Sequence, residues 1–133
     1  MPKQLAATLD RVEDRVGKVT DQLMAVERHM HDKYPVNPSC PMGSTDFGTK
    51  TDLDNCIGAI SHITWDLCRT LYYTSTLDDE PAAKQWLVVL GNIKPHPIPK
   101  DVTDPDTVLA AETLAYAHQR IASLLADLRG VEG

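Results

Sequence analysis

Residues 5–30 read LAATLDRVEDRVGKVTDQLMAVERHM, and this stretch decides the fold. Its apolar residues follow one another at alternating steps of four and three: Leu5, Leu9, Val12, Val16, Val19, Leu23, Val26 and Met30. This spacing places the eight side chains along one side of an α-helix, and charged residues occupy half of the other positions. Because one helix cannot bury its own apolar side, the repeat predicts a bundle in which other helices cover this stripe.

Two downstream segments carry the same spacing. In the first, from Thr51 to about Thr76, the repeat comprises Leu53, Ile57, Ile60, Thr64, Leu67 and Leu71. The second should start after an Asp104 cap and end near Gly130. Its repeat comprises Ala110, Leu114, Ala117, Ile121, Leu124 and Leu128. We expect two long helices that pack beside the first at shallow angles.

A shorter helix is expected between these two. It should begin at Asp78 or Asp79, carry Pro81 in its first turn and end at Gly91. Its centre, WLVVL at residues 86–90, is apolar on every side, which predicts burial all round. A short apolar run is also compatible with a strand, but the preceding AAKQ favours a helix.

Two connections contain the residues that interrupt helices. The segment from Tyr34 to Lys50 holds three prolines and two glycines, which exclude a regular helix, so a long loop is expected there. The segment from Lys94 to Lys100 reads KPHPIPK and should form an extended, polyproline-like strap across one end of the bundle.

The fold class is therefore all-α. We predict an antiparallel four-helix bundle with three long helices, one short helix and a long loop containing proline and glycine. A chain of 133 residues has the usual size of one domain, so residues 1–133 should form a single helical-bundle domain.

Charge and composition restrict the partners and the compartment. Nineteen acidic and thirteen basic residues give a net charge of −6, which repels phosphate backbones and anionic membranes. We therefore expect no direct nucleic-acid binding and no membrane association. The first residues lack the apolar core of a signal peptide, and no window approaches the ~20 apolar residues of a membrane span. Cys40, Cys56 and Cys68 are odd in number and lack a CxxC spacing, which is typical of reduced thiols in a cytoplasmic protein.

The histidines allow a metal site but do not favour one. His29 and His31 lie close in sequence to Cys40, and imidazole and thiolate suit zinc or iron. The apolar repeat, however, turns His31 and His62 away from the core, and the Glu-x-x-His spacing of carboxylate bundles is absent. We expect surface histidines, no metal ligands and no cofactor. The alternative is a small metal-dependent enzyme or metal-binding helical bundle that uses His29, His31, His62, His118 or Cys40.

No sequence motif specifies a reaction. The chain has no glycine-rich phosphate loop, no GxSxG and no HExxH. Asp78, Asp79 and Glu80 are explained by their place at a helix start, where acids match the helix dipole. Cys40 lies in a loop, but a thiol nucleophile needs a neighbouring base that the sequence does not identify. We therefore name no catalytic residue and expect a binding protein rather than an enzyme.

The side of the second helix opposite its apolar repeat has an unusual composition. His62, Trp65, Arg69, Tyr72 and Thr76 follow one another at steps of three or four, with Tyr73 beside them. Aromatic residues and arginine are what binding interfaces concentrate. The alternative is that Trp65 and Tyr72 pack against the short third helix. Tyr116 and Arg120, four residues apart on the last helix, form a weaker candidate of the same kind.

These observations lead to one functional hypothesis and two alternatives. The leading hypothesis is a non-enzymatic helical binding protein that forms a homo-oligomer and docks a protein partner or a small ligand. Docking would involve the outward side of the second helix and the loop from Tyr34 to Lys50. The alternatives are the metal-dependent bundle and a regulator that acts on the protein parts of a nucleic-acid machine.

Overall fold

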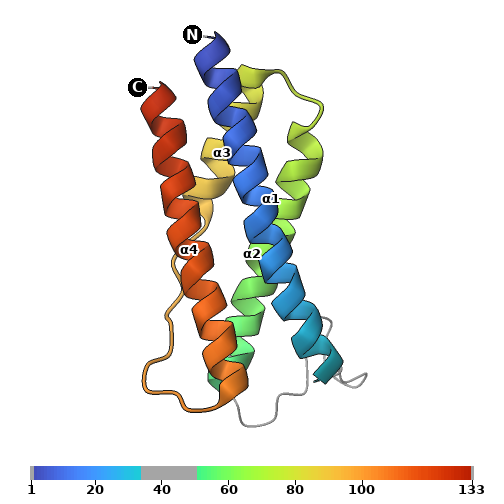
Figure 1. Cartoon of the computed structure of the whole chain (residues 1–133), viewed down its shortest axis with the longest axis vertical. Helices are drawn as coiled ribbons and strands as arrows, with labels where there is room; N and C mark the ends of the chain where they lie inside the picture. The colour runs from blue at the N-terminus through green and yellow to red at the C-terminus, as the bar shows by residue number, and fades with distance from the viewer. Residues whose placement is uncertain (1, 34–50, 133) are drawn as a thin grey trace.

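The described chain is a bundle of antiparallel helices. The structure is a computed structural model that describes residues 2–33 and 51–132. Within these ranges it contains no strand and four helices, α1 (Pro2–Lys33), α2 (Thr51–Thr74), α3 (Asp79–Asn92) and α4 (Pro105–Glu132). Neighbouring helices in sequence run in opposite directions, so both termini lie at the same end (Figure 1). The predicted fold class is confirmed, whereas the predicted loop from Tyr34 to Lys50, with Cys40, lies outside the described residues.

The apolar repeats form the core, and each helix contacts the other three. Seven of the eight stripe residues of α1 are buried, and Leu5 is partly buried against the same core. All six repeat residues of α4 are buried, as are five of the six on α2, while Leu71 is partly buried. The sequence prediction that other helices cover the stripe of α1 is therefore confirmed.

Buried threonines along the helices donate their hydroxyl hydrogens to backbone carbonyl oxygens of the same helix. Thr64, a member of the core repeat of α2, donates to the carbonyl oxygen of Ile60 at 2.7 Å. Thr74 donates in the same way to the carbonyl of Thr70, also at 2.7 Å. Because the acceptor lies four residues back on the same helix, a hydroxyl can occupy the core without an unsatisfied donor.

The short helix α3 is not buried on every side. Trp86 and Leu90 point into the core and are at most 1 % exposed, whereas Val88 is 57 % exposed. The prediction of burial all round is therefore wrong at Val88. Two residues correspond to about 200° of rotation around a helix. A helix packed against neighbours on one side must therefore turn Val88 to the opposite side.

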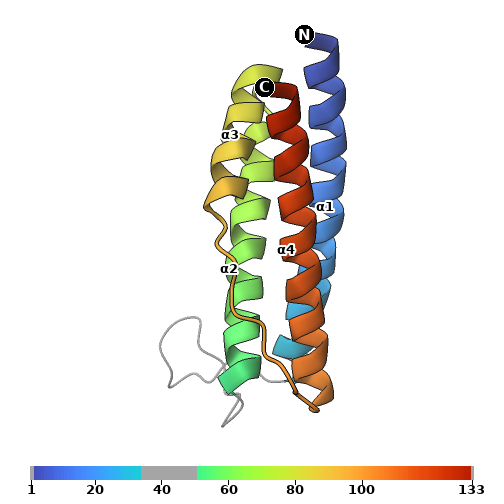
Figure 2. The ribbon, with the colours of Figure 1, turned by 90° about the vertical axis from the view of Figure 1, so that its left-hand side faces the viewer.

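Residues 93–104, which contain the predicted strap and are called the strap from here on, link α3 to α4 and run along the length of the bundle. The strap descends along the side of the bundle beside α2 and α4 (Figure 2), so the prediction that it crosses one end is wrong. The physical reason is helix length, because α3 has 14 residues and α4 has 28. The strap covers the side that α3 is too short to cover. At its end the predicted cap is confirmed, because Asp104 Oδ2 accepts from the backbone N–H of Thr107 at 3.1 Å.

Candidate functional site

The helix α2 carries a second row of side chains opposite its core repeat. We name this row the outward stripe and define it as His62, Trp65, Arg69 and Tyr72 of α2 together with Thr76, which lies in the turn after the helix ends at Thr74. Trp65 is 67 % exposed and Tyr72 is 74 % exposed, and the neighbouring Tyr73 is 58 % exposed. The alternative in which Trp65 and Tyr72 pack against α3 is therefore wrong. Trp86, which belongs to α3 itself, fills the space between that helix and the core.

The end of α2 presents its two tyrosines side by side. The rings of Tyr72 and Tyr73 meet edge to face, with centroids 5.3 Å apart and planes at 82°. The hydroxyl groups of Ser75 and Thr76 donate to the carbonyl oxygens of Tyr72 and Tyr73, at 2.7 and 3.1 Å. These bonds satisfy carbonyl groups that the end of the helix leaves without partners. The aromatic part of the outward stripe therefore sits on a well-formed final turn.

The outward stripe carries little net charge. Between residues 57 and 74 the chain has a single carboxylate, Asp66, and a single guanidinium, Arg69. Arg69 Nη2 lies 3.4 Å from Asp66 Oδ1, and His62 Nε2 lies 3.7 Å from Asp66 Oδ2. Asp66 is thus flanked by two basic side chains on its own helix. A nearly neutral face on a chain with net charge −6 is chemically distinct from the charged outer positions of α1.

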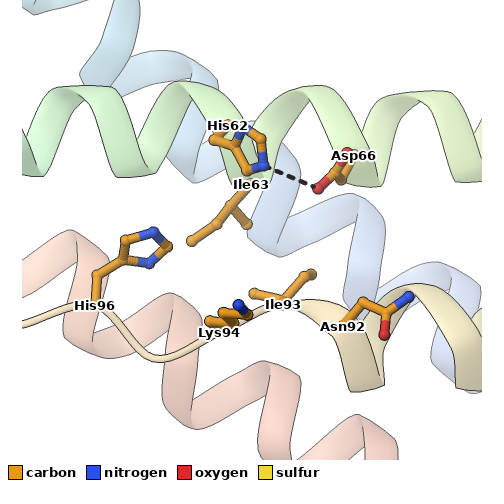
Figure 3. A pocket seen from close by; sticks show the side chains of 7 residues that line it. All are labelled: His62, Ile63, Asp66, Asn92, Ile93, Lys94 and His96. Atoms are coloured by element: carbon orange, nitrogen blue, oxygen red, sulfur yellow. Dashed lines mark ion pairs between the residues drawn. The ribbon is translucent and has the colours of Figure 1, made fainter.

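The two flanks of the stripe have different neighbours. On one flank, Cys68 Sγ lies 3.9 Å from Met24 Sδ of α1. On the other, a pocket of about 260 Å³ opens between α2 and the strap. Figure 3 shows the side chains from α2, the end of α3 and the strap that line it. Its lining consists of His62, Ile63, Asp66, Asn92, Ile93, Lys94 and His96.

Two histidines attach the strap to α4. The backbone N–H of His96 donates to Nε2 of His118 at 3.2 Å, and the two rings stack with centroids 5.6 Å apart. Nε2 can accept this bond only while it carries no proton. Burial lowers the pKa of His118 below its usual value, and the neighbouring His96 lowers it further. The contact between strap and bundle therefore depends on a neutral His118.

This contact predicts a dependence of stability on pH. Since the pKa of His118 is lower in the folded chain, the unfolded chain binds the proton more readily. The stabilisation is present above the unfolded pKa of about 6.5 and is lost as the pH falls below it. Urea unfolding should give a smaller free energy at about pH 5.5 than at about pH 7.5. The difference should shrink in a His118→Gln variant and persist in a His29→Gln control, and equal pH profiles for wild type and His118→Gln would contradict the assignment.

The residues of the metal alternative do not form a ligand set in the described ranges. His29 and His31 lie on α1, His62 on α2 and His118 on α4. No group of three or more histidine, cysteine, aspartate or glutamate side chains suited to a metal ion occurs among residues 2–33 and 51–132. Cys40 lies outside these ranges.

The two cysteines that the structure describes both have raised pKa values. Burial raises the pKa of Cys56, and Asp52 raises it further. Burial also raises the pKa of Cys68, with contributions from Glu27 and Asp21. A raised pKa leaves less of the reactive thiolate near neutral pH.

Tyr116 and Arg120 lie apart from the outward stripe. The guanidinium of Arg120 sits 5.2 Å from the ring centroid of Tyr116, which is partly buried against the core. The same row of α4 continues to Ser123 and Asp127, and both of these bond Arg15 of α1. Tyr116 and Arg120 therefore belong to the flank of α4 that faces α1, and they are not part of the site on α2.

The chain was compared with family models, curated proteins and solved structures. No family model matches the chain, and the searches of curated proteins and of solved structures found no match. Among the described helices, none combines the length and the apolar character that crossing a bilayer requires. The outward stripe of α2 is therefore the feature of the molecule that bears most directly on function.

Proposed function

We propose that this chain is a non-enzymatic helical binding protein whose outward stripe accepts a helix of a protein partner. The observation that carries the proposal is the exposure of Trp65 and Tyr72 in the outward stripe, with the exposed Tyr73 beside them. Large aromatic side chains and arginine contribute most of the affinity at protein interfaces, because they combine contact area with hydrogen-bonding groups. A contiguous group of three exposed aromatic side chains is typical of a surface that a partner covers.

The spacing of the row supports a helix as the partner. Within α2 the outward stripe advances from His62 to Tyr72 by steps of three and four. The core repeats of α1, α2 and α4 advance in the same way, and each of them packs against helices. A row with this spacing stays in contact with a second helix over several turns when the two cross at a shallow angle.

The pocket beside the strap enlarges the same surface. His62 and Asp66 line it from α2, and Lys94 and His96 line it from the strap. A helix seated on the outward stripe would pass along the mouth of this pocket. Side chains of such a partner would find an ammonium group and two imidazoles there as hydrogen-bonding groups.

A comparison of three baits tests the proposal. The baits are the wild type, a Trp65→Ala/Tyr72→Ala double variant and a Val88→Ala control, in which an exposed apolar residue of α3 is truncated. Pull-down from the native host with quantitative mass spectrometry should recover partners with wild type and control and lose them with the double variant. All substituted positions are exposed, so the melting temperatures should stay close together. Recovery of the same proteins in equal amounts by all three baits would refute the proposal.

A further inference from the structure

We infer that the occupant of the outward stripe is a second copy of this chain, with its α2 packed antiparallel to the first. The two copies would be related by a two-fold axis that passes beside Cys68. The inference rests on the proposed function and names the partner. In such a pair, a residue that precedes the axis lies opposite a residue that follows it by about the same number of positions.

The aromatic residues are placed symmetrically for this arrangement. Trp65 precedes the axis by three positions and Tyr72 follows it by four. Trp65 of each copy therefore meets Tyr72 of the other, and the contact forms twice. Both side chains are mostly exposed in the single chain and free to be covered. Aromatic pairs of this kind stack or meet edge to face and contribute beyond their buried area.

The charged residues fit the same axis. Asp66 precedes it by two positions, Arg69 follows it by one, and the two side chains touch within one chain. Asp66 lines the strap pocket, and Arg69 reaches toward the same flank of α2 through this contact. Rotation about the two-fold axis keeps each flank on its own side, so Asp66 of one copy faces Arg69 of the other. His62 and Tyr73 are related in the same way, and an imidazole and a phenol can share a hydrogen bond.

The charge of the whole chain favours this face over the others for self-association. Each copy carries a net charge of −6, so two copies repel each other at long range. The exposed positions of α1 are densely charged with both signs, for example Asp10, Arg11, Asp14 and Lys18, so two copies meeting there would have to pair or desolvate many charges. The segment 57–74 of α2 has only Asp66 and Arg69, whose charges cancel. Along this segment of α2, two copies can approach without bringing like charges together, and the acids near the Cys68 flank, Asp21 and Glu27, belong to α1.

A charge-exchange experiment tests the pairing. The proteins are the wild type, Asp66→Arg and Arg69→Asp, each examined alone by sedimentation velocity over a range of concentrations, and the two variants mixed in equal amounts. The wild type should dimerise. Each single variant should dimerise at least about tenfold more weakly, because two arginines or two aspartates then face each other across the interface. The mixture should recover dimers that contain one copy of each variant, since the arginines of one face the aspartates of the other.

Three results would overturn the inference. The first is a wild type that stays monomeric at every concentration. The second is a single variant that dimerises as tightly as the wild type, and the third is a mixture that forms no mixed dimers while both variants keep their helical circular dichroism. A Trp65→Ala variant should also be monomeric. Because Trp65 is exposed, this variant should fold normally, so it separates a loss of dimerisation from a folding defect in the charge variants. A monomeric wild type removes the second copy as the partner, whereas the three-bait comparison decides separately whether the stripe binds another protein.

Discussion

Replacement of Trp86 by alanine should lower the free energy of unfolding by about 3–5 kcal/mol. The side chain is 0 % exposed and belongs to the core between α3 and the longer helices. Its indole N–H has no hydrogen-bond partner within the described residues, so the loss is one of apolar contact and of the volume left empty. Because α3 has only 14 residues, the loss of its largest core side chain should also weaken its attachment to the bundle.

The second tryptophan supplies the matched control. Trp65→Ala removes the same side chain from a position that is 67 % exposed, and should change the free energy of unfolding by no more than about 0.5 kcal/mol. Urea unfolding of both variants, followed by circular dichroism at a low protein concentration, makes the comparison. If the two substitutions cost the same, the assignment of one tryptophan to the core and the other to the surface is wrong.

The second large effect is expected on α1. Leu23→Asp should destabilise the chain by about 4 kcal/mol or more, which approaches the whole stability of many domains. Leu23 is 1 % exposed and lies in the apolar core, where an aspartate would find no compensating charge. The variant should therefore be largely unfolded or keep its carboxyl group protonated.

The neighbouring residue provides the control for register. Met24 is 37 % exposed, so Met24→Asp should cost about 1 kcal/mol or less. Helical circular dichroism and the melting temperature distinguish the two variants. An equal loss in both, or a larger loss in Met24→Asp, would mean that the buried side of α1 has been placed incorrectly.

The helices could be predicted because local sequence determines them. The four-three repeat identified the buried sides of α1 and α4, and the Asp104 cap marked where α4 begins. The repeat could not show how far α3 is covered, since WLVVL contains no polar residue that would mark an outer side. The exposure of Val88 and the course of the strap along the bundle both depend on how the four helices pack, which no local sequence pattern records.

The candidate site was predictable only in part. A helical period is enough to align Trp65, Arg69 and Tyr72 on one side of α2, but it does not reveal whether another helix covers them. The pocket and the contact between His96 and His118 join segments that are distant in sequence. The only local signal for them was a histidine and a lysine in a segment rich in proline. The four-residue spacing of Tyr116 and Arg120 is enough to bring them together, but it could not show that their row of α4 faces α1, where Ser123 and Asp127 bond Arg15.

Oxidative footprinting of the two tryptophans, read residue by residue by mass spectrometry, tests most directly whether the outward stripe is a free surface that a partner covers. In dilute purified protein, Trp65 should be oxidised rapidly and Trp86 should be protected. In concentrated protein or in extract of the native host, Trp65 should become protected while Trp86 is unchanged. Protection of Trp65 already in the dilute protein, or equal oxidation under all conditions, would contradict the account.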